Sequence, residues 1–151
     1  DVLEAWEAKG RALTLAGRGR EGLAAFETVL AAAPRRELAL AGAATLAQLL
    51  DRLDPAIGYW RQAVEANPYA AAYRGNLARL LAHKGDWAEA RVHCQAWLEL
   101  DPGSTDAREL WVRCLVREGR KEQARAEFAR LERLGPSNLA ELRAWFAVHG
   151  R

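Results

Sequence analysis

Few side chains in this chain of 151 residues could act in covalent or acid–base chemistry. The candidates are Cys94, Cys114, Ser104, Ser137, His83, His93 and His149. A hydrolase or transferase needs a nucleophile, a general base and a group that orients the base. Few residues of this chain could fill these three roles. The histidines show neither an HExxH motif nor a paired spacing, and the cysteines lack the CxxC spacing of zinc, redox or haem-attachment sites. We therefore expect no enzymatic activity, no metal site and no cofactor.

The serines and cysteines among these candidates have simpler structural explanations. Ser104 and Ser137 precede predicted helices, where a hydroxyl group can cap the first backbone N–H groups. Cys94 and Cys114 fall at apolar positions of a repeating pattern, and a buried cysteine behaves as a small hydrophobic residue. A disulfide between them is the less favoured alternative. Two cysteines are too few for a disulfide scaffold, which favours a reducing compartment and hence the cytoplasm.

The composition is that of a helical protein. The chain contains 32 Ala, 22 Leu and 19 Arg but only 7 Val, 1 Ile and 4 Thr, which suits helices and excludes an all-β fold. The 22 basic and 20 acidic residues leave a net charge of +2, so bulk charge indicates neither a nucleic-acid-binding tail nor an acidic disordered tail. The longest weakly polar run, residues 38–50, is shorter than the roughly 18 residues that a membrane-spanning helix needs. No membrane span is predicted.

The elements that must position any site recur along the chain at a constant interval of 34 residues. One column of this repeat contains the prolines Pro34, Pro68, Pro102 and Pro136, and a second contains Gly17, Asp51, Gly85 and Gly119. A third column contains the small residues Gly22, Ala56, Ala90 and Ala124. Two further columns are apolar and contain Phe26, Trp60, Cys94 and Phe128, and Leu13, Ala47, Leu81 and Leu115. Columns that agree in register identify internal repeats.

Each repeat is predicted to be a helical hairpin, because its apolar residues follow the i, i+3, i+4, i+7 spacing of a helix face. The glycine column ends the first helix by adopting positive φ, and the proline column ends the second helix. Asp86 and Glu89 have the spacing of a capping box for the second helix of their repeat, and Asp54 before Pro55 is expected to begin the corresponding helix one repeat earlier. The small residues of the third column would let the paired helices approach closely.

The 34-residue period and its motifs resemble the tetratricopeptide repeat. The best-matching segment contains Asn76-Leu77, Gly85-Asp86-Trp87, Glu89-Ala90 and the run from Leu98 to Pro102. The resemblance covers repeats 3–36, 37–70, 71–104 and 105–138, followed by a capping helix over 139–149. It implies an all-α, right-handed superhelical solenoid of antiparallel helix pairs, forming a single domain over 1–151. We expect this domain to be part of a larger protein, and the excess of 19 Arg over 3 Lys is typical of a bacterial, GC-rich genome.

In a solenoid of this kind the first helices line a concave face, and their inward positions trace one helix face. Arginine recurs along this line at Arg79, Arg113 and Arg117, next to Asn76 and His83. One interpretation is that these are ordinary solvated charges, since Glu7, Asp106 and Glu109 face the same groove. The other is that Asn76, Arg79, His83, Arg113 and Arg117 form a peptide-binding groove that recognises an extended acidic segment.

The sequence therefore predicts a protein–protein interaction scaffold whose concave groove binds a peptide or partner segment, with acidic segments as the favoured class. The partner is a protein or peptide whose identity the sequence leaves open. A structural spacer, or a module that self-associates through its end repeats within a larger multidomain protein or enzyme, is the alternative. Nucleic acid is not an expected partner, because the eight basic residues of repeat 105–138 are mostly offset by six acidic ones.

Overall fold

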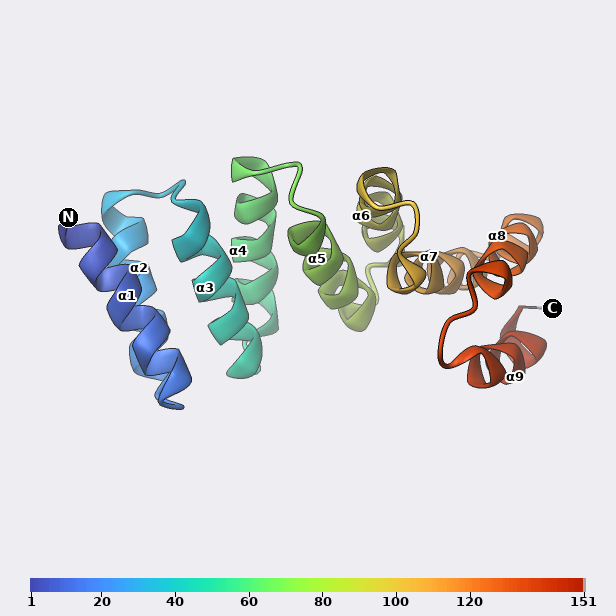
Figure 1. Cartoon of the computed structure of the whole chain (residues 1–151), viewed down its shortest axis with the longest axis horizontal. Coiled ribbons are helices and arrows are strands. Elements are labelled where there is room, and N and C mark those ends of the chain that lie inside the picture. The colour runs from blue at the N-terminus through green and yellow to red at the C-terminus, as the bar shows by residue number, and fades with distance from the viewer. Residues whose placement is uncertain (151) are drawn as a thin grey trace. The chain divides into compact units, whose positions relative to one another are not determined.

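The computed structural model describes residues 1–150, and every regular element in that part of the chain is a helix (Figure 1). The helices are α1 (Val2–Leu15), α2 (Gly19–Ala32), α3 (Glu37–Leu49), α4 (Leu53–Ala66), α5 (Ala71–Lys84), α6 (Trp87–Leu100), α7 (Thr105–Arg117), α8 (Lys121–Leu134) and α9 (Leu139–His149). Short turns join consecutive helices, and α1 packs on α2, α3 on α4 and α7 on α8. The all-α class expected from the composition is confirmed.

The chain divides into two compact units, residues 1–73 and residues 74 onward. The first unit contains α1 to α4 and the first residues of α5. The second unit contains the rest of α5 and the helices from α6 to α9.

The turn between the two helices of a pair has the same geometry in all four repeats. The residue of the glycine column has a positive φ each time, with values of 72° at Gly17, 57° at Asp51, 96° at Gly85 and 72° at Gly119. The next backbone N–H donates to the carbonyl five residues earlier, as from Arg52 to Ala47 and from Asp86 to Leu81, both at 2.8 Å. A left-handed residue followed by this bond is the Schellman ending of a helix. The glycine column therefore does end each first helix as predicted.

The predicted side-chain caps of the second helices are wrong. Asp86 is the N-cap residue of α6, but its side chain makes no capping hydrogen bond. Helix α4 begins at Leu53, so Asp54 and Pro55 lie inside its first turn instead of starting it. The serine cap of α7 is confirmed, since the Ala107 N–H donates to Ser104 Oγ at 3.2 Å.

Ser137, the other serine expected to cap a helix, does not do so. Helix α9 begins at Leu139, and its N-cap residue is Asn138, which makes no side-chain capping bond.

The core of the first unit is built around the ring of Phe26, which is 3% exposed and comes from α2. The ring packs with Leu23, Val29 and Leu46 in one apolar cluster. It also lies directly against two glycines of the neighbouring first helices: a Cβ atom added to Gly10 of α1 or Gly42 of α3 would come within 2.9 or 2.5 Å of the ring. Phe26 therefore reaches between α1 and α3 only because both positions lack a side chain.

A partly buried ion pair joins the end of the α2–α3 loop to α1. The Arg36 guanidinium donates through Nε and one terminal nitrogen to the two carboxylate oxygens of Glu7, at 2.7 and 3.1 Å. Glu7 is only 3% exposed. The hydrogen bonds that Arg36 donates to Glu7 raise the pKa of Arg36 above its ordinary value. Glu7, expected in the groove from its position, is therefore neutralised inside the fold.

The core of the second unit is covered at its C-terminal end by α9. Leu142 is 2% exposed and packs with Val112, Phe128 and Leu131. The Phe146 ring stacks on Phe128 with a centroid distance of 4.2 Å and an interplanar angle of 2°. Helix α9 thus contributes side chains to the core formed by α7 and α8.

Candidate functional site

The five residues predicted to form a binding groove lie on two first helices of the second unit. Asn76, Arg79 and His83 belong to α5, and Arg113 and Arg117 belong to α7. All five are at least partly exposed to solvent. The helical spacing of three and four residues places them along one face of each helix.

Arg79 is held by an aromatic ring and by a carboxylate. Its guanidinium carbon lies 4.8 Å from the centre of the Trp97 ring, within the range of a cation–π contact. One terminal nitrogen donates to Asp106 Oδ2 at 3.2 Å. Both partners of this ion pair are exposed, with 48% and 70% of their side chains accessible, so solvent screens it and it contributes little stability.

Arg113 is held in a similar way but more firmly. Its Nε and one terminal nitrogen donate to Glu109 Oε1 at 3.0 and 2.8 Å. The other oxygen of Glu109 accepts a hydrogen bond from Asn138 at 3.2 Å. The Arg113 guanidinium also lies 4.5 Å from the centre of the Trp145 ring of α9. A small open pocket of about 230 Å³ lies between Arg79, Asp106, Glu109, Leu110 and Arg113.

Arg117 differs because no carboxylate neutralises it within the described residues. Its guanidinium lies 5.3 Å from the centre of the Trp87 ring. His83 and Asn76 also have no side-chain hydrogen-bond partner in that part of the chain. The predicted groove is therefore less basic than its arginines suggest, because Asp106 and Glu109 offset two of the three positive charges.

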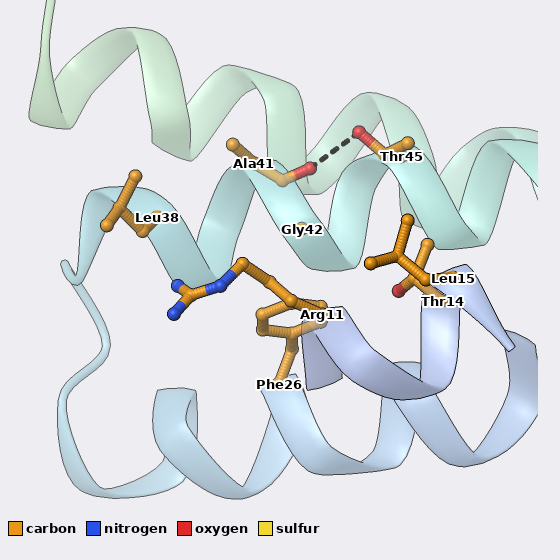
Figure 2. A pocket seen from close by; sticks show the side chains of 8 residues that line it. All are labelled: Arg11, Thr14, Leu15, Phe26, Leu38, Ala41, Gly42 and Thr45. Carbon is orange, nitrogen blue, oxygen red and sulfur yellow. Dashed lines mark hydrogen bonds between the residues drawn. The ribbon is translucent and has the colours of Figure 1, made fainter. Parts of the chain in front are cut away.

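A second feature, which the sequence analysis did not single out, is an apolar pocket in the first unit (Figure 2). It has a volume of about 370 Å³ and lies between α1 and α3. The Phe26 ring and Gly42 contribute to its inner surface, and Leu15, Leu38 and Ala41 contribute apolar side chains. Figure 2 shows the Arg11 guanidinium extending toward the Leu38 end of the pocket, with Leu15 and Thr14 at the opposite end.

The cysteines considered for catalysis are buried, and two of the histidines contact neighbouring groups of the fold. Cys94 and Cys114 are free, and both are 0% exposed. A hydrogen bond with Cys114 and burial raise the pKa of the Cys94 thiol far above its ordinary value, which keeps it protonated and poorly nucleophilic. His93 Nδ1 lies 3.2 Å from an Arg74 nitrogen, and His149 Nδ1 lies 2.9 Å from the Trp145 carbonyl oxygen.

Within residues 1–150, no three His, Cys, Asp or Glu side chains lie close enough together to hold a metal ion. Within the same residues, no helix combines the length and apolar character needed to cross a membrane.

Solved structures of known proteins share this fold at low sequence identity. A mutant of MamA is 23% identical with a TM-score of 0.80, and the match covers 87% of this chain and 77% of that one. YrrB, described as a TPR protein with an unusual peptide-binding site, is 20% identical with a TM-score of 0.80 over 94% of this chain and 76% of its own. MamA of Desulfovibrio magneticus RS-1 is 19% identical with a TM-score of 0.76 over 87% and 75%. At these identities the likeness shows the fold alone.

Comparison with family models is more specific. No curated protein sequence matches this chain. Two family models, each described as tetratricopeptide repeat, match residues 42–105 and 81–145. Together they span residues 42–145, well over half of the chain, and they agree with the helix pairs and left-handed turns found in every repeat. The chain belongs to the tetratricopeptide repeat family.

Proposed function

We propose that this chain is a protein-interaction scaffold whose second unit binds an extended acidic segment of a partner along α5 and α7. The tetratricopeptide repeat fold supports a scaffold for protein–protein interaction in general. The acidic segment and the residues that bind it are our proposal for this chain. Asn76, Arg79, His83, Arg113 and Arg117 form the proposed groove.

The observation that carries the proposal is that each groove arginine lies over a tryptophan ring. Arg79 lies over Trp97, Arg113 over Trp145 and Arg117 over Trp87, with guanidinium-to-ring distances of 4.8, 4.5 and 5.3 Å. A long arginine side chain normally loses much conformational freedom when it binds a ligand. Because the rings already restrict these side chains, less entropy is lost when they bind carboxylates.

A carboxylate of an incoming ligand can take the place of a carboxylate that already lies in the groove. Asp106 is 70% exposed and bonds Arg79 in a solvent-screened pair, so an incoming carboxylate can replace it at small cost. Arg117 has no carboxylate partner to displace within the described residues. Arg113 is different, since its carboxylate partner Glu109 is also bonded to Asn138. We therefore assign charge recognition to Arg79 and Arg117, and a mainly structural role to Arg113.

The test uses a labelled peptide of alternating Glu and Ser, compared with the same peptide carrying Gln in place of Glu. We expect fluorescence anisotropy to show binding of the glutamate peptide alone, and to show weaker binding as salt concentration rises. The double variant Arg79→Glu with Arg117→Glu should abolish this binding, because charge reversal converts attraction into repulsion. Circular dichroism should remain unchanged, since both side chains lie outside the core.

The matched control reverses two charges on α8, in the variant Lys121→Glu with Arg125→Glu. The Lys121 side chain has no ion-pair or hydrogen-bond partner within the described residues, and Arg125 forms an exposed ion pair with Glu122. Arg91 is unsuitable as a control because its Nε lies 2.8 Å from Glu118 in a largely buried pair. Equal loss of binding in the α8 variant would show a bulk charge effect and contradict the proposed groove. If neither peptide binds and the chain forms oligomers in light scattering, a self-association module becomes the better interpretation.

A further inference from the structure

The first unit exposes apolar side chains where its first helices face solvent. Leu15 of α1 is 90% exposed, and Leu38 and Leu49 of α3 are 59% and 71% exposed. Exposed apolar side chains that border a pocket are typical of interaction surfaces, whereas single exposed ones are common on any protein. Leu15 and Leu38 lie at opposite ends of the pocket formed by α1 and α3 (Figure 2).

Two glycines leave room for the aromatic ring that lines this pocket. Gly10 and Gly42 allow the Phe26 ring of α2 to lie between α1 and α3. The pocket is therefore lined by an aromatic ring and by backbone where side chains would normally fill the space. Its volume of about 370 Å³ falls within the range of about 300–1,000 Å³ that is typical of ligand pockets.

The polar groups around the pocket point to the chemistry of its occupant. The hydroxyl groups of Thr14 and Thr45 donate to the Gly10 and Ala41 carbonyl oxygens, each at 2.8 Å, so their hydrogens are already used. Arg11 is exposed and has no ion-pair or hydrogen-bond partner in the described part of the chain. The pocket thus combines an apolar interior with one uncompensated positive charge at its edge.

We infer that this pocket binds a short peptide segment of a partner protein, with one large aliphatic or aromatic side chain inserted against Phe26 and a neighbouring carboxylate bound by Arg11. The inference rests on the proposed scaffold function and names a second binding element for it. Charge complementarity selects this occupant, because a purely apolar segment would leave the Arg11 charge without a partner. A purely acidic segment would leave the apolar surface of Leu15 and Leu38 in water.

The experiment selects binders to the full chain from a displayed library of random peptides and measures their Kd as synthetic peptides. We expect enrichment of peptides with Leu, Ile, Phe or Trp within two residues of Asp or Glu. Three variants test the pocket. Ala41→Phe fills it, Leu15→Ser with Leu38→Ser removes its exposed apolar walls, and Arg11→Glu reverses its charge. Each should raise Kd by about tenfold or more, which corresponds to a loss of about 1.4 kcal/mol or more of binding free energy.

Each variant has a matched control on a second helix. Ala24→Phe and Arg20→Glu change exposed residues of α2, and Val92→Ser removes an apolar side chain of α6 that is 54% exposed. These controls should leave Kd within about twofold of the wild type, which is a difference of less than about 0.5 kcal/mol in binding free energy. The variant Leu15→Ser with Leu38→Ser should keep its fold, since both side chains lie mostly in solvent. A loss of binding in this variant is therefore not an effect of misfolding.

The outcomes separate this inference from the proposed function. Selected peptides that are insensitive to the pocket variants but lose binding with Arg79→Glu and Arg117→Glu would overturn the pocket and leave the scaffold function standing. Selected peptides that bind the pocket variants and the groove variant as tightly as the wild type would overturn both assigned sites. Failure to enrich any peptide over an unrelated bait would contradict both the pocket and the scaffold function.

Discussion

Asp51 adopts a backbone conformation that the other three repeats give to glycine. Its φ is 57°, compared with 72°, 96° and 72° at Gly17, Gly85 and Gly119. An L-amino acid in this left-handed region costs about 1–2 kcal/mol, less for Asp and Asn, which tolerate it best. The turn between α3 and α4 therefore contains backbone strain. In the sequence, Asp51 at a position where the other repeats have glycine indicates this strain.

Replacing this residue should relieve the strain. We expect Asp51→Gly to raise the free energy of unfolding by up to about 1 kcal/mol, the left-handed penalty less the greater entropy that glycine loses on folding. Chemical denaturation monitored by circular dichroism measures the change. The reciprocal variant Gly85→Asp should lower the free energy by a similar amount, since no atom lies within 4 Å of the added Cβ and backbone strain alone acts. A less stable Asp51→Gly variant would show that the aspartate side chain contributes more than the strain costs.

Single residues also show how far the candidate site follows from the sequence. Helical spacing alone places Arg79, Arg113 and Arg117 on the exposed faces of two first helices. The pairing of Arg113 with Glu109 has the i, i+4 spacing of a helical ion pair, so the sequence already contains that signal. The pocket beside Phe26 was not predicted, because it depends on contacts between one aromatic ring and two glycines of different helices, which only the folded structure brings together.

At the scale of helices, the turns follow from the sequence but the caps do not. A side-chain cap needs an N-cap residue with extended backbone, and Ser104 has this with ψ of 112°. Asp86 instead directly follows the left-handed Gly85, and the tight turn holds its ψ at 62°. Its side chain is then not directed at the first N–H groups of α6. Residue type alone predicts a cap at Asp86, while the backbone set by the preceding glycine excludes it.

The small residues between paired helices give a prediction at the same scale. Ala90 of α6 is 0% exposed, and at the equivalent position of the first repeat an added Cβ on Gly22 would lie 3.2 Å from the Gly10 carbonyl oxygen. We expect Ala90→Leu to lower the free energy of unfolding by about 1–3 kcal/mol, because the larger side chain forces the helices apart. Thermal and chemical unfolding measure the loss.

The control for this overpacking is Ala88→Leu, which adds the same side chain to an exposed position of α6. It should leave stability within about 0.5 kcal/mol of the wild type, as surface substitutions do. If the Ala90→Leu and Ala88→Leu variants have the same melting temperature, the two helices of this pair do not pack through Ala90.

At the scale of the whole molecule, the repeat period predicts the helical class and the family but not the division into two units. The 34-residue columns continue without interruption across residues 73 and 74, where the units meet in sequence. Repeat proteins are stabilised by contacts between neighbouring elements, so a local change in packing can divide the chain without any break in its period. The repeat columns therefore do not indicate where along the chain one unit ends and the next begins.

The stability of the C-terminal end of the second unit depends on α9, because a terminal repeat needs an element that covers its last apolar surface. Leu142 is 2% exposed, and the Phe146 ring stacks on Phe128 at 4.2 Å, so removal of α9 would uncover Phe128, Leu131 and Val112. We expect truncation after Asn138 to lower the melting temperature and to promote aggregation, measured by circular dichroism and light scattering.

The milder variant Leu142→Ala tests the same contact without removing the helix. It should cost about 2–5 kcal/mol, the usual penalty for truncating a fully buried leucine. Val148→Ala, at a position of α9 that is 74% exposed, is the matched control and should leave stability and solubility unchanged. A truncated chain that stays monomeric with the stability of the full chain would mean that α7 and α8 complete their core without α9. In that case Leu142→Ala should also have no effect, since both changes act through the same apolar surface.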